Sequence, residues 1–386
     1  MHYRLLFAIL ATAFIEQTVV SIVRITTTYR AVELGLSVVW LGIITAVYVV
    51  LPIVIGVQIG RFIDRGHDAV TTWFGGGLLI VSCAGFALFP DLVALLVFTA
   101  LTGAAHLMFN ISQQFMCTRC GSDPGAMERA IGNYMVANAC GQGVGPYVVG
   151  LAGGSASIPP TRLLFAIAAG GAVLTLASAL TIRPSGAREA KAKRGKPPPL
   201  RELLFIPGLT TLMLVSVVTV VAQDLIVVYL PLLGAERGMS VDSVGALLAV
   251  RAVASMVSRL SFARLLTALG RVPLTLMSTF VSAGVYASLA VPLPLPAMYA
   301  AIALAGFALS ISMTASIAGV LGIASGGAVG TANSLRTMGN RIGQFVIPFL
   351  ASLLAAATGT AGIFLIIGLS LAASGAAIRF GGRRTR

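Results

Sequence analysis

The stretch Arg183–Arg201 reads RPSGAREAKAKRGKPPPLR and stands near the middle of a 386-residue chain. It holds seven of the chain's 26 Lys and Arg residues, one Glu and four prolines. A segment this polar cannot bury enough apolar surface to pack, and its prolines oppose helix formation. We therefore predict a solvated linker over 183–204 that joins two halves of the chain, 1–182 and 205–386.

The composition of the whole chain points to a membrane. Hydrophobic residues make up 57% of it and charged residues only 10%, whereas a soluble domain carries about 25% charged residues. Too few polar side chains are present to cover a water-facing surface, so we predict an all-α protein that crosses the bilayer many times. The formal net charge of +14 does not indicate nucleic acid, because the cations cluster in short connections on one side.

Apolar stretches of about 20 residues, long enough to cross a bilayer, divide both halves of the chain. We predict twelve such spans, six on each side of the linker. In the first half they are 5–27, 38–60, 71–89, 92–115, 128–152 and 161–182. In the second half they are 206–230, 241–263, 272–291, 295–320, 331–356 and 361–379.

The basic residues of the connections indicate the orientation of the chain. One side of the predicted spans has the linker and Arg61, Arg65, Arg119, Arg129, Arg264, Arg271 and 379–386. Lys and Arg gather on the cytoplasmic side of membrane proteins, so an even number of spans places both termini in the cytoplasm. We expect a monomer in the cell (inner or plasma) membrane. Its partner is the lipid bilayer, and we expect no nucleic acid as a partner.

The two halves share sequence at two places. Glu33–Ser37 (ELGLS) recurs 203 residues later as Glu236–Ser240 (ERGMS), and the glycines of span 5 recur 198 residues later in span 11. Two anchors in the same order indicate parallel repeats of six spans. We expect Ser37 and Ser240 to cap the second helix of each half. We expect the repeated glycines to let helices approach closely.

Twelve spans, a repeat of six and a basic central loop resemble the major facilitator superfamily. Between spans 2 and 3, Gly60–Gly66 (GRFIDRG) is similar to the family's cytoplasmic loop signature. The resemblance implies a gate, in which Gly60 packs closely and Asp64, next to Arg65, pairs with an arginine. Arg119 at the end of span 4 is the candidate partner. The alternative is an ordinary charged turn between two helices.

Span 5 resembles the drug/proton antiporter branch of that family. Gly141–Gly150 reads GQGVGPYVVG and is similar to the Gly-x3-Gly-Pro motif of those proteins. The resemblance implies that Gly141, Gly145 and Pro146 form a bent, smooth helix that slides during gating. The alternative is simple close packing of helices. Val149 departs from the double glycine that usually ends this motif.

Span 4 departs further from the antiporters. Thr99 stands where they usually carry an arginine associated with proton transfer, and Thr102 stands where they carry a glutamine. This difference bears on the coupling mechanism that the resemblance implies, and leaves the implied fold unchanged.

Three titratable residues inside the spans are candidates for proton coupling: Glu16, His106 and Asp224. A charged group at mid-depth costs at least about 2.5 kcal/mol, so each requires a reason. Glu16 is the first candidate, and the alternative is a purely structural role for its carboxyl. Asp224 is the next candidate, and the alternative is an ion pair with Arg251. For His106 we favour a histidine satisfied by hydrogen bonds within the bundle.

Arginines and amides inside the spans are candidates for substrate binding: Arg24, Arg251, Arg341, Asn138 and Gln142. A guanidinium can hold a carboxylate through two hydrogen bonds. Arginines outnumber acids within the spans, which favours an anionic substrate. The alternative is that these groups pair with acids, carbonyls or neighbouring helices inside the protein.

The sequence has no phosphate loop and no metal-ligand cluster. We therefore expect that the protein binds no cofactor or metal and is not an enzyme. Cys117 and Cys120 have a redox or metal spacing, but we interpret them as small apolar fillers. We predict a secondary transporter of small organic solutes that works by alternating access, with proton-coupled efflux as its activity. An uptake permease for an organic anion is the first alternative. A non-transporting membrane protein on the same fold is the second.

Overall fold

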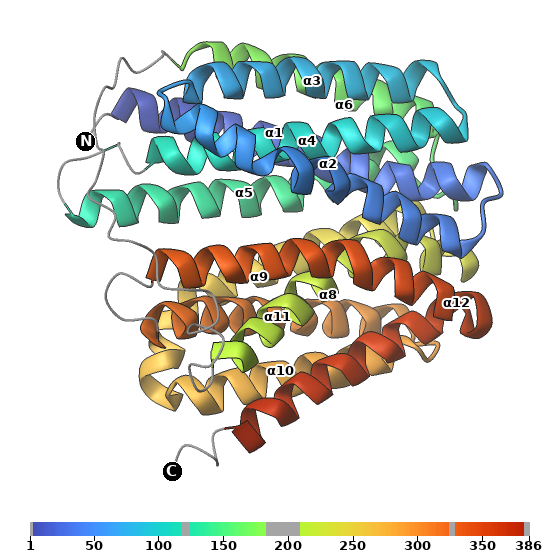
Figure 1. Ribbon diagram of the computed structural model, residues 1–386. Helices are drawn as coiled ribbons and strands as arrows, with labels where there is room; N and C mark the ends of the chain where they lie inside the picture. Colours follow the sequence, from blue (N-terminus) through green and yellow to red (C-terminus); the bar gives the residue numbers. More distant parts are fainter. Residues whose placement is uncertain (1–2, 118–119, 121–123, 183–208, 324–328, 382–386) are drawn as a thin grey trace. The chain divides into compact units, whose positions relative to one another are not determined.

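The structure, a computed structural model, describes residues 3–117, 120, 124–182, 209–323 and 329–381, and these residues are helical apart from short connections (Figure 1). The helices before the predicted linker are α1 (Tyr3–Glu33), α2 (Val38–Asp64), α3 (Asp68–Leu88), α4 (Leu92–Cys117), α5 (Pro124–Gly153) and α6 (Thr161–Leu180). Those after it are α8 (Leu209–Glu236), α9 (Val241–Leu269), α10 (Arg271–Leu289), α11 (Leu295–Ile323) and α12 (Val329–Gly381).

The helices form two compact units. Unit 1 contains Met1–Glu189 and Val228–Ala252, and unit 2 contains Ala190–Val227 and Val253–Arg386. The end of α8 and the start of α9 therefore belong to unit 1. The predicted linker lies outside the described residues, and the predicted division of the chain at that linker stays a prediction.

Ten helices in the described part of the chain are long and apolar enough to cross a membrane. The protein is thus a multi-pass membrane protein, and the number of twelve spans stays a prediction. Helix α12 has 53 residues and would be about 80 Å long if straight. Gly359 interrupts it with a non-helical φ of 73° and ψ of 174°, at the boundary predicted between spans 331–356 and 361–379.

The first repeated sequence forms the same turn twice. Gly35 and Gly238 have φ values of 65° and 66°, in the left-handed region that favours glycine. In the first turn the Leu36 N–H donates to the Ala31 carbonyl, and in the second the Met239 N–H donates to the Gly234 carbonyl. These bonds close the end of a helix in the manner of a Schellman motif. The sequence repeat is therefore also a repeat of structure at this turn.

The two serines of this repeat differ in their capping. The Ser240 Oγ accepts a hydrogen bond of 3.2 Å from the Ser243 N–H, as predicted for a helix cap. Ser37 precedes α2 but makes no such side-chain bond, so the prediction was wrong there. At that turn the Trp40 N–H donates to the Ser37 carbonyl instead.

This difference predicts unequal effects of the same substitution. Ser240→Ala should lower the free energy of unfolding by about 1 kcal/mol, because an N–H at the start of α9 loses its acceptor. Ser37→Ala, the matched control, should change it little. Thermal unfolding of the purified protein in detergent measures both, and equal losses would contradict the assignment.

The second repeated sequence also makes equivalent contacts. An ideal Cβ on Gly141 would lie 2.6 Å from the Phe14 carbonyl oxygen of α1, so only glycine fits at this helix contact. In unit 2, a Cβ on Gly339 would lie 3.6 Å from Val217 of α8. Val217 follows Phe14 by 203 residues, the spacing of the first repeat. Close packing of α5 on α1 thus requires glycine at position 141, whereas Gly339 makes an ordinary contact of α12 with α8.

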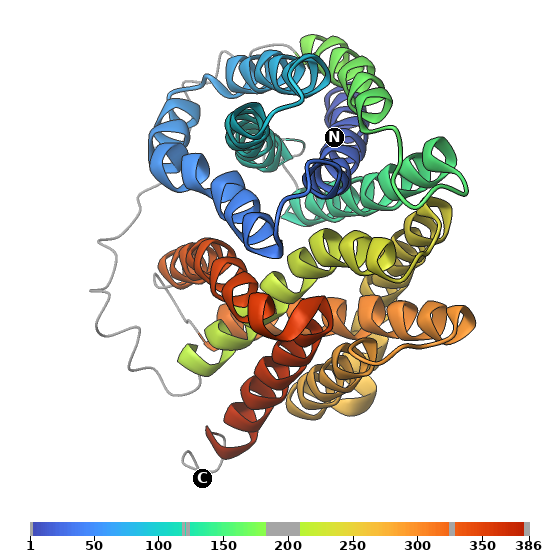
Figure 2. The same ribbon diagram turned by 90° about the vertical axis from the view of Figure 1, so that its right-hand side faces the viewer.

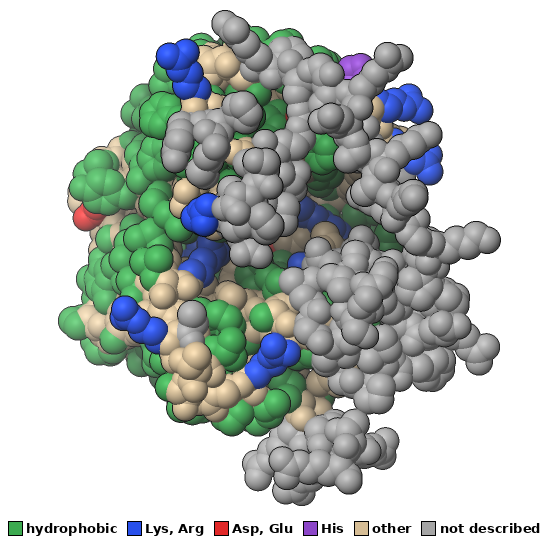
Figure 3. Space-filling view, turned by 90° about the vertical axis from the view of Figure 1, so that its left-hand side faces the viewer, with side chains coloured by type: hydrophobic (Ala, Val, Ile, Leu, Met, Phe, Trp, Pro, Cys, Tyr) green, Lys and Arg blue, Asp and Glu red, His purple; other side chains and the backbone are tan. Residues whose placement is uncertain are grey.

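One end of unit 1 is basic. Arg4, Arg61, Arg65 and Arg129 are exposed at the start of α1, the end of α2 and the start of α5, which lie at the left in Figure 1. Lys and Arg side chains stand out on this face in Figure 3. This distribution is the one expected of a cytoplasmic side, and the cytoplasmic location of the termini stays a prediction.

Candidate functional site

The candidate site lies where α1, α4 and α5 meet in unit 1. Helix α4 contacts α1, α2, α3 and α5, and Figure 2 shows it among these helices when unit 1 is viewed end-on. Helix α2 can approach α4 closely because Gly103 of α4 has no Cβ. A Cβ at this position would overlap the Tyr48 carbonyl group. Side chains from the inner faces of these helices therefore meet in the interior of the unit.

Glu16 and His106 form an ion pair or hydrogen bond in this interior. The Oε1 atom of Glu16 lies 2.7 Å from Nδ1 of His106. Glu16 is 1% exposed, and His106 is half-buried. The structure thus brings together two of the three residues that we predicted for proton coupling, from α1 and α4.

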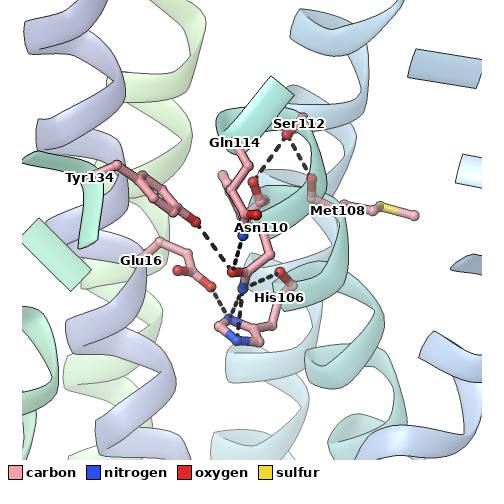
Figure 4. Close-up of polar contacts among 8 residues, drawn as sticks. Glu16, His106, Met108, Asn110, Ser112, Gln114 and Tyr134 are labelled. Atoms are coloured by element: carbon pink, nitrogen blue, oxygen red, sulfur yellow. Dashed lines mark hydrogen bonds and ion pairs between the residues drawn. The ribbon is translucent and has the colours of Figure 1, made fainter. Parts of the chain in front are cut away.

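Asn110 and Tyr134 extend this contact into a network (Figure 4). The Asn110 Nδ2 atom lies 2.9 Å from Nε2 of His106, and the Tyr134 hydroxyl donates to the Asn110 Oδ1 over 3.2 Å. Because Oδ1 accepts from Tyr134, the amide presents its N–H groups to His106. The Nε2 atom is then the acceptor, and the ring proton of the neutral His106 lies on Nδ1, facing Glu16.

This arrangement sets the charge of the pair. With Glu16 ionised and His106 neutral, the pair carries one negative charge, and one added proton makes it neutral overall. The charged form is costly in the interior of a membrane protein.

Helix α4 presents the network along one face. His106, Asn110 and Gln114 follow one another at intervals of four residues, so they share a face of the helix. The Gln114 Nε2 atom donates to the Asn110 Oδ1 over 3.4 Å. Gln114 is exposed, so polar side chains continue from the buried pair to the surface of unit 1.

Tyr48 connects the pair to Arg24. The Arg24 Cζ atom lies 5.2 Å from the centre of the Tyr48 ring, and this ring lies 6.2 Å from that of His106. Arg24, Tyr48 and Thr99 line the same small pocket. Thr99, which stands where the antiporters resembled by the sequence carry an arginine, donates to the Leu95 carbonyl of its own helix over 2.6 Å.

Two predicted binding residues lie nearby on α5. The Asn138 Nδ2 atom donates to the Tyr134 carbonyl over 3.2 Å, so this buried side chain braces the helix one turn from the network. Gln142 is half-buried one turn further along α5. Their predicted role in substrate binding stays a prediction.

Unit 2 has a second polar cluster, between α8 and α12. The Gln344 Nε2 atom donates to the Asp224 carboxylate, and the Gln344 Oε1 accepts from Arg341 over 3.2 Å. One amide therefore links the predicted proton-coupling acid to a predicted binding arginine. Arg251 is buried but belongs to unit 1, so its predicted ion pair with Asp224 stays a prediction.

The predicted gating residues of α5 have different neighbours. Gly141 and Gly145 face α1, and a Cβ on Gly145 would lie 2.8 Å from the Thr18 carbonyl oxygen. The Pro146 carbonyl instead faces α9, where a Cβ on Gly245 would lie 2.5 Å from its oxygen. Beyond this point, the Val241 N–H donates to the Ala156 carbonyl over 2.8 Å, which fastens the end of α5 to α9.

The predicted gate between α2 and α3 is described only in part. Arg119, and with it the proposed pairing of Asp64, lies outside the described residues. Arg65 is exposed, and no described atom lies within 4 Å of a Cβ on Gly60. Gly66 has a φ of 90°, so this glycine is required by the turn itself.

Several residues of these clusters were not among the residues predicted from the sequence. Asn110 and Gln114 could have been found from their spacing of four and eight residues after His106. Gln344 follows Arg341 by three residues, which also places both on one face of a helix. Tyr48 and Tyr134 had no comparable signal, because aromatic residues in apolar helices more often serve only packing.

The two cysteines with a redox spacing lie in an apolar environment. Cys117 and Cys120 are buried in an apolar cluster with Leu6, Ile9 and Ile182. This environment matches their interpretation as small apolar fillers.

Solved structures share the fold of the chain. A bacterial homolog of the human lysosomal transporter Spinster, in an inward-facing and occupied conformation, has a TM-score of 0.79 at 15% identity, covering 98% of this chain and 96% of its own. A D-xylose–proton symporter has a TM-score of 0.79 at 13% identity, covering 97% of both chains. A mutant of the nucleoside transporter NupG has a TM-score of 0.82 at 12% identity, covering 98% of this chain and 99% of its own.

Sequence comparison identifies the family. No curated protein matches the chain. The family model described as Major Facilitator Superfamily matches residues 5–292 and 212–385, which together include both units and every helix of the candidate site. The chain therefore belongs to the major facilitator superfamily and has the fold of a membrane transporter.

Proposed function

We propose that this protein is a proton-coupled secondary transporter of small organic solutes that works by alternating access. The observation that carries the proposal is the buried contact of 2.7 Å between Glu16 and His106. A carboxyl and an imidazole in the interior of a membrane protein are costly when charged. Binding and release of one proton by Glu16 and His106 would explain why the protein has these two groups in its interior.

Binding of the proton then changes the net charge in the interior of unit 1, where α1, α4 and α5 pack. The deprotonated pair carries a net negative charge, which favours access of water or of a cation, whereas the protonated pair is neutral and tolerates closure. Asn110 carries the contact to Tyr134 on α5, so α1, α4 and α5 all meet the titrating groups. Asp224 with Gln344 is a second candidate for the same role.

We infer the gates of the cycle from the neighbours of α5 and from the loop sequence after α2. We infer that the contact between Pro146 and Gly245 separates and reforms during transport, because backbone contacts this close leave no intermediate packing. On the other side, we infer that Asp64 pairs with Arg119 to close the basic end of the molecule. Gly141 and Gly145 keep α5 on α1 throughout.

We infer the direction of transport from the sequence of span 5, which resembles that of drug/proton antiporters. Efflux is therefore the first candidate. We also infer twelve spans, cytoplasmic termini, a monomeric state and the cell membrane, from the charge of the connections and from the repeat.

Uptake of an organic anion is the second candidate function. The predicted spans favour it, since they hold more arginines than acids. A guanidinium can hold a carboxylate through two hydrogen bonds. Direction is the point on which the two candidates differ.

Reconstitution into liposomes tests both candidates. The purified protein is placed in liposomes that contain a pH-sensitive dye, and organic anions or lipophilic cations are added one at a time. We expect a solute-dependent change of internal pH that protein-free liposomes lack. Accumulation driven by an acidic interior supports efflux by exchange, and accumulation driven by an acidic exterior supports uptake. Movement of a radiolabelled solute without any change of internal pH would remove proton coupling.

A further inference from the structure

The side-chain amide of Asn110 has one orientation that its neighbours allow (Figure 4). Its Nδ2 atom donates to the backbone carbonyl of His106 over 3.1 Å. A carbonyl oxygen can only accept a hydrogen bond, so the amide atom beside it must be the nitrogen. The opposite end, Oδ1, accepts from the Tyr134 hydroxyl over 3.2 Å and from Gln114 over 3.4 Å. Separate contacts therefore fix both ends of this amide.

The nitrogen end of the same amide faces the His106 ring. Nδ2 lies 2.9 Å from Nε2 and 3.4 Å from Nδ1 of the imidazole. A neutral imidazole offers one acceptor nitrogen, whereas an imidazolium has an N–H group on both nitrogens and no acceptor. Protonation of the ring would thus place N–H groups against the N–H groups of Asn110. The contact with Asn110 therefore favours a neutral His106.

Glu16 acts on the ring in the opposite direction. Its Oε1 atom lies 2.7 Å from Nδ1 of His106, and a carboxylate this close stabilises an imidazolium. An imidazolium would nevertheless require the Asn110 amide to turn over, which brings Oδ1 against the His106 carbonyl oxygen and breaks the bond from Tyr134. Glu16 is 1% exposed, so an ion pair here also costs the desolvation of two charges.

A proton on Glu16 avoids both costs. Placed on the carboxyl oxygen that does not contact His106, it leaves the bond from Nδ1–H to Oε1 and all contacts of Asn110 in place. The pair then consists of two neutral groups, which cost less than an ion pair in the interior of a membrane protein. The hydrogen-bond pattern therefore favours the carboxylic acid beside a neutral imidazole.

Other titratable or charged side chains near the pair do not change this balance. Among the described residues, these are Tyr134 on α5, Tyr48 on α2 with its ring 6.2 Å from that of His106, and Arg24 on α1, 5.2 Å from the Tyr48 ring. The tyrosines are neutral at physiological pH, and Arg24 is a cation. None of the three supplies a negative charge that would hold the proton on the ring.

We propose that Asn110 is a positioning residue that keeps His106 neutral and directs the added proton to Glu16. The inference rests on the proposed proton coupling, because it names the group that carries the proton. In this step one proton binds to a Glu16 carboxylate oxygen, Glu16 changes from an anion to a neutral acid, and no other covalent bond is formed or broken. His106 keeps its single ring hydrogen on Nδ1 throughout.

Spectroscopy of the purified full-length protein in detergent locates the proton directly. In infrared difference spectra between high and low pH, we expect a protonated-carboxyl band that is absent from Glu16→Gln. In nitrogen NMR of histidine-labelled protein, we expect the His106 ring to keep one protonated and one unprotonated nitrogen at both pH values. The chain has three histidines, so the His106 signals are identified by their loss in His106→Gln.

Substitution of Asn110 should move the proton to the ring. In Asn110→Leu the opposing N–H groups are gone, so low pH should protonate both ring nitrogens and the Glu16 band should disappear. Asn110→Asp has nearly the same shape and gives the ring a second carboxylate, so the midpoint of proton binding should rise by at least about one pH unit. Gln114→Leu is the matched control, because it removes an amide that contacts Oδ1 and leaves Nδ2 unaltered. Its spectra should be those of the unsubstituted protein.

Each result decides for or against this role of Asn110. Absence of the Glu16 band at low pH, a doubly protonated His106 ring in the unsubstituted protein, or a ring that stays neutral in both Asn110→Leu and Asn110→Asp would overturn it. Proton-coupled flux in liposomes together with a protonated ring would overturn this inference alone. The expected spectra without any proton movement in liposomes would overturn the proposed coupling and leave the role of Asn110 standing.

Discussion

Glu16→Gln should abolish accumulation driven by a pH gradient, down to the level of protein-free liposomes, while exchange of solute for solute continues. Glutamine keeps the shape of the side chain, and its Oε1 can still accept the hydrogen bond from His106 Nδ1. It cannot ionise, so the pair no longer alternates between a charged and a neutral form. The variant therefore separates movement of solute from coupling to protons.

The measurement compares two assays on the same liposomes. The first is uptake driven by a pH gradient, and the second is counterflow of labelled against unlabelled solute at equal pH. Glu33→Gln is the matched control, since it makes the same change at the end of the same helix. The Glu33 side chain is 51% exposed, so both activities should be retained in that variant.

Two results would contradict the role given to Glu16. Unchanged gradient-driven accumulation in Glu16→Gln would show that protons are coupled elsewhere, with Asp224 and Gln344 as the next candidates. Loss of both activities together with a lower melting temperature would show that Glu16 mainly supports the fold. Retained counterflow is thus the reading that distinguishes coupling from structure.

The elements of the fold that could be predicted are those with a local cause. The sequence repeated at Glu33–Ser37 and Glu236–Ser240 predicted a repeat of structure, and the turns at Gly35 and Gly238, both with positive φ, agree with it. Most helix ends agree within four residues with the predicted spans, because the apolar runs that set their length can be counted in the sequence. Helices α1, α8 and α9 end six residues later than predicted, and α12 covers two predicted spans. The cap at Ser37 failed, since a serine before a helix does not determine whether its hydroxyl or its carbonyl takes the free N–H.

The candidate site was predictable by residue type but not by partner. Glu16 and His106 were named because titratable groups are costly in a membrane span. Their contact could not be predicted, because α1 and α4 are separate helices and their distance depends on packing. His106 was expected to be a histidine satisfied by hydrogen bonds within the bundle. That its partner is the Glu16 carboxyl could not be predicted either. Tyr48 and Tyr134 gained a role only when their neighbours were known.

Gly103 is the residue on which this packing most depends. A Cβ at this position would overlap the Tyr48 carbonyl oxygen and lie 2.8 Å from its carbonyl carbon. Backbone atoms cannot move aside as a flexible side chain can. We therefore expect Gly103→Ala to push α2 away from α4 and to lower the free energy of unfolding by about 1–3 kcal/mol or more.

Gly77→Ala in α3 is the matched control for Gly103→Ala. No described atom lies within 4 Å of a Cβ there, and alanine favours a helix over glycine by about 1 kcal/mol. The two substitutions should therefore change the melting temperature of the purified protein in opposite directions.

Displacement of α2 also moves the Tyr48 ring, which faces both Arg24 and His106. Any folded Gly103→Ala protein should then lose solute binding and proton coupling together, and retention of both at wild-type stability would show that the contact of α2 with α4 does not position the site.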